Sequence, residues 1–380
     1  PNSGGNHSSP FITENTEYVV AGTRFSVPPD NANGDVPINT YKQNFKGNVT
    51  FVSVNKDNGN MDIAFQIETP GVNFDLSHAG KGPSHGWFFF SCYNTEQANT
   101  LLEVNASKND KDFIMAVNWK KAEEYIKAGK GKKVPVKYVH NKFNEETHTA
   151  TTETLKEVTV LDSRELEGLC YFIPCPKSPH GCDVDPTGEY IVGSGKLAAL
   201  IPVFSFTKMI KAIEDKAFEG KYGDIPVIKY EAALHGEVQK PGLGPLHTEF
   251  DGKGNAITSM FVSSELVKWN IKDLKILDRV PTYYSVGHLM IPGGDSKKPD
   301  AKYVVAYNKI TKDRYLPTGP ELSQSAQLYD ISGDKMQLIL DFPTIGEPHY
   351  AQAVRAEKVK DKSRKIFKIE ENKHPYAAKG

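Results

Sequence analysis

The sequence is short of three features that would each have indicated a particular class of protein. Its 380 residues include only 4 cysteines, too few for a disulfide framework in a chain of this length. No apolar run approaches the roughly 18 residues that a transmembrane helix requires. The 46 Lys and Arg residues balance 47 Asp and Glu residues, so the net charge of -1 gives no general attraction to nucleic acid or to an anionic membrane.

The remaining composition, with 38% hydrophobic and 24% charged residues, is typical of a globular protein. The four cysteines (Cys92, Cys170, Cys175 and Cys182) form no CxxC pair, which favours buried free thiols over a local metal site or disulfide. Basic runs at Lys127–Lys133 and Lys358–Lys365 indicate solvated loop or tail, with a docking surface as the alternative. The opening PNSGGNHSSP lacks the regions of a signal peptide, and its abrupt polar start suggests that residues once preceded it.

Short β-branched and aromatic runs, separated by Gly, Pro, Asn and Asp, predict antiparallel strands along most of the chain. These runs are Asn48–Val54, Met61–Gln66, Trp87–Ser91, Tyr190–Gly193, Ala256–Val262, Tyr303–Ala306 and Met336–Leu340. Two segments have helical spacing instead, Trp119–Lys127 and Phe206–Phe218, and we expect them to be insertions on a β scaffold.

Similar turn sequences recur along the chain. Asp and Gly supply tight turns after Asp185 and Asp251, and related turns follow Pro299 and Ile331. A turn repeated every few tens of residues indicates one repeated supersecondary unit. The pattern is that of an all-β protein, best matched by the four-stranded blades of a β-propeller, with a β-sandwich or two-sheet domain as the alternative. We predict a partial propeller over residues 1–360 and a linker over residues 361–380, where the sequence becomes charged and weakly periodic.

Four of the 11 histidines share one local context, with Gly or Pro within the three preceding residues: His180, His247, His288 and His349. Successive members are 67, 41 and 61 residues apart, which suits one histidine per blade. If each begins the innermost strand of its blade, the four imidazoles meet at one end of the central channel. Imidazoles gathered without carboxylates or thiolates favour copper or zinc. His78 and His85 flank a Gly-rich turn, where a structural or hydrogen-bonding role is favoured.

Several long segments resemble nitrous oxide reductases. They are KSPHGCDVDPTGEY, GLGPLHTEFDGKGNAITSMFVSSELVKW, KDRYLPTGPELSQSAQLYDISGD, GEPHYAQA and YNTEQANTLLEV. The similarity extends over nearly the whole chain.

The resemblance implies a seven-bladed β-propeller followed by a cupredoxin domain with a dinuclear copper site. At the propeller hub of that family, seven histidines bind a tetranuclear copper–sulfide cluster that reduces nitrous oxide to dinitrogen and water. His180, His247, His288 and His349 correspond to four of these ligands. The motifs of the other three, an Asp-x-His-His pair and an Ile-His-Gly segment, do not occur in this sequence, and neither does the cupredoxin domain. We therefore expect a piece of the enzyme that lacks its first blades and is inactive alone.

The resemblance also assigns catalytic roles and a second metal. Lys309 and Glu347 match a lysine and a glutamate near the cluster, where they would supply protons or orient a ligand. Calcium ligands correspond to Tyr93 and Glu96, to either Asp110 or Asp112, and to Ser178, where many members have Asn, so that this last ligand is in doubt.

The family works in the bacterial periplasm, in denitrification, as a head-to-tail homodimer in which the partner supplies the cupredoxin domain. A c-type cytochrome or cupredoxin would donate the electrons. A non-catalytic propeller that serves as an interaction scaffold is the competing hypothesis. A zinc hydrolase is disfavoured because no general base accompanies the histidines.

Overall fold

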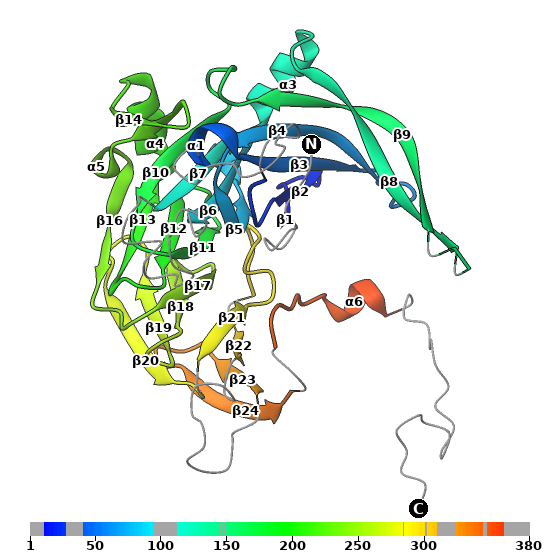
Figure 1. The fold of residues 1–380 in the computed structure, drawn as a ribbon. Helices are drawn as coiled ribbons and strands as arrows, with labels where there is room; N and C mark the ends of the chain where they lie inside the picture. Colours follow the sequence, from blue (N-terminus) through cyan, green and yellow to red (C-terminus); the bar gives the residue numbers. More distant parts are fainter. Residues whose placement is uncertain are drawn as a thin grey trace, which may run out of the picture.

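The computed structural model describes residues 11–27, 41–93, 112–144, 146–147, 149–283, 285–300, 302–309, 324–344 and 348–360. Their strands form five sheets that follow one another along the chain (Figure 1). No helix in this part of the chain is long and apolar enough to cross a membrane. The predicted linker, residues 361–380, lies outside the described residues.

The first sheet has six strands in the order β1-β2-β3-β4-β9-β8. Their bounds are β1 Phe11–Ile12, β2 Tyr18–Gly22, β3 Lys46–Val54, β4 Met61–Pro70, β8 Lys132–Asn144 and β9 Thr149–Asp162, with the short helix α1 at Tyr41–Asn44. β9 runs parallel to β4, and the other pairs are antiparallel. β8 and β9 are the longest strands, and Figure 1 shows their hairpin projecting beyond the rest of the molecule.

The second sheet has the order β14-β15-β10-β7-β6-β5. Its strands are β5 Asn73–Ala79, β6 Trp87–Tyr93, β7 Asp112–Asn118, β10 Cys170–Cys175, β14 Phe218–Tyr222 and β15 Ile225–Ile228. A 3-10 turn, η2 Gly82–Ser84, separates β5 from β6, and the helix α3 Trp119–Lys127 follows β7. The strands β5, β6, β7 and β10 form an antiparallel blade, and β15 pairs in parallel with β10.

Three further sheets are four-stranded antiparallel blades in which neighbouring strands follow in chain order. The third sheet contains β11 Pro179–Val184, β12 Tyr190–Gly195, β13 Leu200–Ser205 and β16 Leu234–Gln239, with α4 Phe206–Glu214 and α5 Tyr230–Ala233 as insertions. The fourth contains β17 Pro245–Phe250, β18 Asn255–Met260, β19 Glu265–Asn270 and β20 Ile276–Pro281. The fifth contains β21 Val286–Met290, β22 Tyr303–Asn308, β23 Ser325–Asp330 and β24 Gln337–Pro343, and the short helix α6 Ala356–Val359 comes after it.

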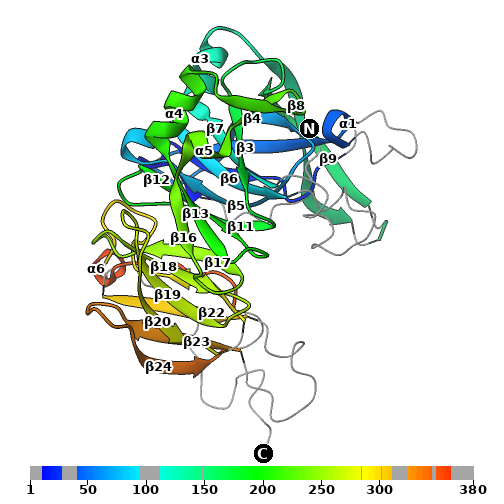
Figure 2. The ribbon, with the colours of Figure 1, turned by 90° about the vertical axis from the view of Figure 1, so that its left-hand side faces the viewer.

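The sheets are arranged around one axis, with their first strands innermost. β11 contacts both β5 and β17, and β17 contacts β21, so the inner strands of four successive sheets line a common centre. Figures 1 and 2 show the sheets fanning out from this line. The architecture is a β-propeller, as the repeated turns predict, and not a sandwich of two facing sheets.

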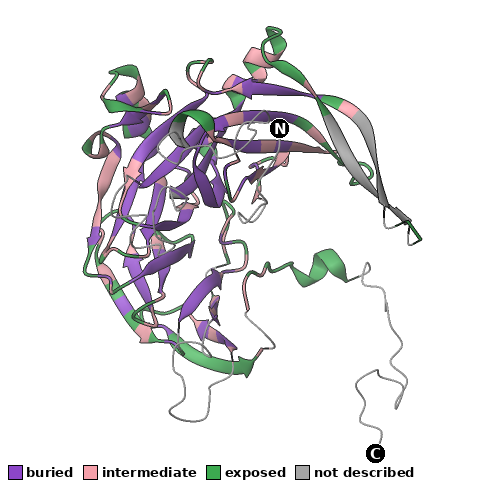
Figure 3. Cartoon of the chain, viewed as in Figure 1, coloured by how far each residue is buried: buried purple, intermediate pink, exposed green. Residues whose placement is uncertain are grey.

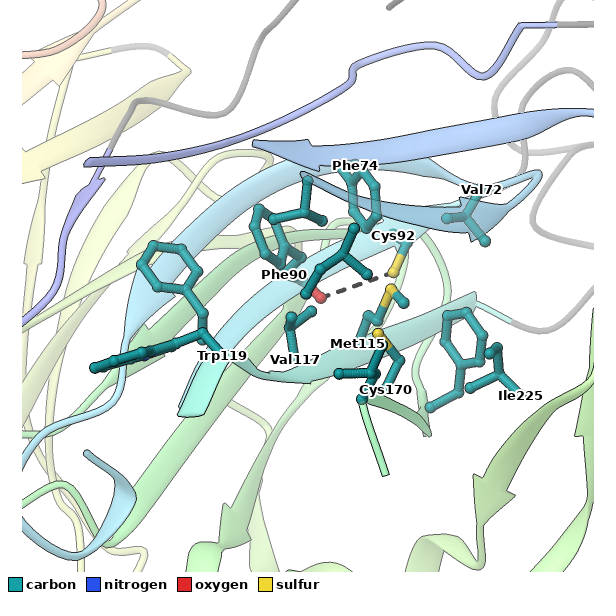
Figure 4. Close-up of a cluster of buried hydrophobic side chains, with 14 of the residues drawn as sticks. Val72, Phe74, Phe90, Cys92, Met115, Val117, Trp119, Cys170 and Ile225 are labelled. Atoms are coloured by element: carbon teal, nitrogen blue, oxygen red, sulfur yellow. Dashed lines mark hydrogen bonds between the residues drawn. The ribbon is translucent and has the colours of Figure 1, made fainter. Parts of the chain in front are cut away.

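Hydrophobic side chains fill the spaces between neighbouring sheets. One cluster joins the first two sheets and includes Phe74, Phe90 and Trp119, all at most 1% exposed (Figure 4). Figure 3 shows that burial concentrates on the strands near the axis. The four cysteines are free thiols, as predicted; three are buried, and the Cys92 thiol donates a weak hydrogen bond to the Phe90 carbonyl oxygen at 3.7 Å.

Capping side chains start the two longer helices. The Asn118 side chain accepts from the Lys121 amide at the start of α3, which spans the predicted segment. The Ser205 hydroxyl accepts from the Lys208 amide at the start of α4. The predicted extension of this second helix to Phe218 is wrong, because the chain enters a positive-φ conformation at Lys216 and Phe218 begins β14.

Candidate functional site

Each inner strand carries one extra residue at the same point of its ladder. The pairing register shifts around His180 in β11, around His247 in β17 and around His288 in β21. Such a bulge leaves the extra residue unpaired and redirects its side chain. Three of the four predicted histidines therefore occupy equivalent positions of successive blades. His349 follows β24 and lies outside any strand, so the expectation that it begins an inner strand is wrong within the described residues.

The structure brings the four imidazoles together at one end of the central channel. We call them the histidine hub. The ring centroids of His180 and His247 are 4.8 Å apart, those of His247 and His288 are 3.8 Å apart, and those of His288 and His349 are 4.3 Å apart. The rings thus form a continuous group rather than lying on separate faces of the molecule.

Burial favours the neutral form of the His180 and His247 imidazoles. His180, His247 and His288 are at most 7% exposed. Burial lowers the pKa of His180 despite the nearby Asp75 carboxylate, and burial together with the neighbouring imidazoles lowers the pKa of His247 well below its ordinary value. Nε2 of His247 has no hydrogen-bond partner among the described residues. Neutral imidazoles are the form that binds metals.

Asp75 occupies the bulge of β5 that corresponds to the histidine-bearing bulges of the next three blades. Its buried carboxylate hydrogen-bonds Nδ1 of His180. This contact fixes the orientation of the ring and directs Nε2 toward the hub. The sequence analysis missed Asp75, because only the folded chain brings its carboxylate beside His180.

Buried serines on the second strands connect one blade to the bulge of the next. The Ser91 hydroxyl of β6 donates to the His180 carbonyl oxygen at 2.6 Å, and the Ser259 hydroxyl of β18 donates to the Gly287 carbonyl oxygen at 2.6 Å. Both serines are fully buried. These bonds hold the backbone on which the hub histidines are mounted.

Lys309, the predicted catalytic lysine, lies beside the hub. It is 7% exposed, and its charge contributes to the lowered pKa values of both His180 and His247. A side chain at Gly287 would collide with its methylene groups, so the glycine leaves the space through which the Lys309 side chain passes. The other predicted catalytic residue, Glu347, lies outside the described residues.

The side chains of the hub are of a type that binds copper. Their arrangement, however, is not that of a site for a single metal ion. The donors are imidazoles, three of them buried, and imidazoles suit copper. Within the described ranges, however, no three or more His, Cys, Asp or Glu side chains are arranged so that they could hold a metal ion. The four imidazoles therefore fit as part of a larger set of ligands rather than as a complete one.

Two of the predicted calcium ligands lie together. Oδ2 of Asp112 accepts from the Ser178 amide at 2.7 Å, and both residues are buried. Tyr93 ends β6 directly after Cys92, which pairs with Phe113, so its backbone lies near Asp112. The side chain of Tyr93, and the whole of Glu96 and Asp110, lie outside what the structure describes.

A second buried polar group, which the sequence analysis did not identify, lies next to the hub in the channel. Its carboxylates are Asp183, Glu249 and Asp295, which we call the axial acidic group. His78 and Lys81 lie with them: Nδ1 of His78 accepts from the Val184 amide at 2.9 Å, and the Lys81 ammonium donates to the Val184 carbonyl oxygen at 2.6 Å. The hydrogen-bonding role expected for His78 agrees with this contact. An acidic residue two or three positions after His180 and His247 was the available signal in the sequence.

Blades around an axis, with buried imidazoles from successive blades at its centre, define a β-propeller protein with a histidine hub. The family described as "Nitrous oxide reductase propeller repeat" matches residues 279–349. The nitrous-oxide reductase of Stutzerimonas stutzeri is 31% identical over 364 residues, which cover 91% of this chain and 50% of that protein. The chain is therefore a homologue of nitrous oxide reductases over about half of their length.

Other relatives agree in name and extent. The nitrous-oxide reductase of Pseudomonas fluorescens is 31% identical over 367 residues, and that of Cupriavidus necator (strain ATCC 17699 / DSM 428 / KCTC 22496 / NCIMB 10442 / H16 / Stanier 337) is 33% identical over 273 residues, 68% of this chain and 38% of that protein. The chain spans about half the length of the first two relatives. A solved structure from Desulfotomaculum acetoxidans DSM 771 covers 88% of this chain at 10% identity and a TM-score of 0.46, too low to carry an argument.

Proposed function

We propose that this chain supplies the propeller part of a copper-dependent nitrous oxide reductase. The reaction consumes one nitrous oxide, two electrons and two protons, and it yields dinitrogen and water. The observation that carries the proposal is the contact of four imidazoles, three of them buried at equivalent positions of successive blades and the fourth from His349 after β24. His180, His247, His288 and His349 would hold part of a tetranuclear copper–sulfide cluster, which when bound supplies electrons to the substrate.

The protein's own residues have separate roles in this proposal. Asp75 orients the His180 imidazole through its Nδ1 contact. Lys309, buried beside the hub, stabilises negative charge on the departing oxygen or donates a proton to it. Glu347 would orient a ligand in the same region. The blades exclude bulk water from the hub, which strengthens each of these electrostatic contacts.

The remaining features of the proposal follow the family. Three further histidines would complete the set of cluster ligands, and without them we expect no turnover from this chain alone. Tyr93, Glu96, Asp112 or Asp110, and Ser178 would hold calcium. A homodimer partner would supply a cupredoxin domain with dinuclear copper, electrons would come from a c-type cytochrome or cupredoxin, and the compartment would be the periplasm.

Copper binding by the chain tests the proposal directly. The apo chain is titrated with Cu(I) under anaerobic conditions, and bound copper is measured after gel filtration. We expect His247→Ala and His288→Ala each to lower the copper retained, while His235→Ala, a histidine of the third blade outside the hub, leaves it unchanged. Equal retention in all four proteins would rule out the hub as the copper site, and sustained nitrous oxide reduction by the chain alone would contradict the incomplete ligand set.

A non-catalytic propeller remains the second candidate function. It differs from the first candidate in that it requires no metal at the hub. The same titration separates the two candidates, since an interaction scaffold would retain no copper that depends on the hub histidines.

A further inference from the structure

Two cavities meet at Asp295. The larger, of about 720 Å³, is lined by Glu14, Lys81 and Lys297 among others. The smaller, of about 20 Å³, is lined by Asp183 and Glu249 and by the hub residues His247 and His288. Phe11, Asp295 and Tyr350 line both cavities, and Asp295 is the only carboxylate common to the two linings. It therefore stands between an open space and the hub.

The smaller cavity has the size and the polar wall of a site for one water molecule. Its volume exceeds the ~10–15 Å³ that a water requires, and a stable buried water needs two to four polar partners. Glu249 provides one of these, because its Oε2 atom is buried without a hydrogen-bond partner among the described residues and the residue is 8% exposed. Gly294 leaves room for this carboxylate, since a Cβ there would lie 1.7 Å from Oε2.

Two side chains, Gln352 and His78, contact the carboxylate of Asp295. Gln352 donates from Nε2 to one carboxylate oxygen at 3.1 Å, and Nε2 of His78 lies 3.4 Å from the other. Nδ1 of His78 accepts from a backbone amide, and Nε2 lies 3.4 Å from both the Asp295 carboxylate and the Lys81 ammonium. The side chain of Asp295 remains 25% exposed, so the carboxylate reaches the larger cavity.

Burial favours a carboxyl at Asp295 that can carry a proton. Burial raises the pKa of Asp295, while Gln352 and the Lys81 ammonium act in the opposite direction. Burial also lowers the pKa of Lys81 to about 8. The other titratable groups that face Asp295 are His78 from β5, Asp183 from β11, Glu249 from β17 and the Tyr350 phenol, with Glu14 and Lys297 across the larger cavity.

We propose that Asp295 transfers protons from the larger cavity to a water molecule in the smaller cavity beside His247 and His288. This inference rests on the proposed function, because that reaction consumes protons at the hub. In each transfer the Asp295 O–H bond breaks and its proton joins the water, which releases one of its own protons toward the hub. Water in the larger cavity then reprotonates the carboxylate. Two such transfers serve each nitrous oxide reduced, and no electrons move through Asp295.

A metal-free measurement tests the proton-carrying state of Asp295. Infrared spectra of the apo chain and of Asp295→Asn are subtracted over a pH series, in H2O and in D2O. We expect a carboxylic acid carbonyl band that belongs to Asp295, shifts in D2O, and persists above the ordinary aspartate pKa of ~3.9. Glu14→Gln, a carboxylate that lines the larger cavity alone, should leave this band in place. A difference spectrum in which Asp295 titrates as an ordinary carboxylate would overturn the proposal.

The rate of nitrous oxide reduction then tests the proton transfer itself. It is measured in the complete enzyme that contains this chain. We expect Asp295→Asn to lower kcat about tenfold or more and to increase the solvent deuterium isotope effect, since positioned proton donors contribute ~10²–10⁴-fold. Asp295→Glu, which keeps a carboxyl, should recover part of the rate, and Glu14→Gln should match the wild type. An unchanged kcat and isotope effect in a folded Asp295→Asn protein would refute the transfer. Absence of turnover in the wild type would instead count against the proposed function and leave the infrared result standing.

Discussion

At the scale of single residues, Gly287 determines where Lys309 can lie. A Cβ atom at Gly287 would be 1.8 Å from Cδ and 2.5 Å from Cγ of Lys309, in the middle of that side chain. We expect Gly287→Ala to displace the lysine from its buried position and to destabilise the fold by about 1–3 kcal/mol through overpacking. The displacement is measured in the apo protein by reductive methylation and mass spectrometry, with Lys309 modified several-fold faster in the variant.

Gly333→Ala is the matched control, since a Cβ there would approach no atom closer than 3.9 Å. It should leave both the stability and the labelling of Lys309 unchanged. If Lys309 is labelled at the same rate in Gly287→Ala as in the wild type, the glycine does not position it.

Asp162 gives one stabilising contact a defined pH dependence. Its carboxylate accepts hydrogen bonds from Nε and Nη2 of Arg164 at 2.9 and 2.6 Å, and although burial alone would raise its pKa, these bonds lower it. Because the folded-state pKa lies below the unfolded value, the stabilisation is complete above the unfolded pKa and is lost as the pH falls through the folded pKa. We expect Asp162→Asn to cost about 1–3 kcal/mol in urea unfolding near pH 7, and less as the pH falls below ~3.9.

The neighbouring Glu165 provides the control for this prediction. Its side chain is 64% exposed and lies 3.8 Å from the Lys132 ammonium. Glu165→Gln should change the unfolding free energy by no more than about 0.5 kcal/mol. A cost of Asp162→Asn that stays constant with pH would contradict the role assigned to the carboxylate.

At the scale of elements, Ser259 couples the fourth blade to the bulge of the fifth. Its hydroxyl donates to the Gly287 carbonyl oxygen and accepts from the His247 amide at 3.2 Å. Ser259→Ala leaves both backbone groups without this partner in a buried place, and we expect it to lower the free energy of unfolding by about 1–3 kcal/mol. Urea unfolding measures the loss. Ser332→Ala, in an exposed turn, should stay within about 0.5 kcal/mol of the wild type, and an equal loss in both variants would show that the link between blades is not responsible.

The elements that the sequence predicts well are those set by local chemistry. The turn after Asp185 forms because its carboxylate accepts from the Thr187 and Tyr190 amides, and that after Asp251 forms because its carboxylate accepts from the Lys253 and Asn255 amides. The helix over Trp119–Lys127 follows equally from its spacing and its capping residue. The end of α4 could not be predicted, because Phe218 pairs with Ile228 and this long-range contact outweighs the helical spacing.

At the scale of the whole molecule, the outer strand of the fifth blade is unusually apolar for its exposure. Leu338, Ile339, Leu340 and Phe342 of β24 are between 41% and 52% exposed. Figure 3 shows this strand as an exposed edge. An apolar edge strand favours association with other chains.

We expect Leu338→Glu combined with Leu340→Glu to reduce concentration-dependent light scattering, with a change in unfolding free energy of less than ~1 kcal/mol since little apolar surface is removed from the core. Leu277→Glu, at a position of β20 that is 45% exposed, serves as the control and should scatter like the wild type. Scattering that is unchanged in the double variant would show that β24 does not drive association.

The hub could be predicted from the sequence because a repeat brings equivalent positions of successive units together in space, so four histidines in one local context indicate one place. The axial acidic group follows no such rule. Asp183 and Glu249 follow their histidines by three and two residues, while Asp295 arrives from a loop after β21, and only the folded chain brings them together. The parallel pairing of β9 with β4 was likewise not predicted, since its partners, such as Phe65 and Thr159, lie far apart in the sequence.

The irregular position in each inner strand has a consequence for divergence among relatives. Since the additional residue forms no rung of the ladder, replacing its side chain costs the sheet little, and β5 already has Leu76 where the next three blades have histidine. A single codon substitution can therefore add or remove a donor at the axis while the surrounding architecture persists. The set of side chains that could bind a metal at the axis can therefore change faster during evolution than the propeller fold itself.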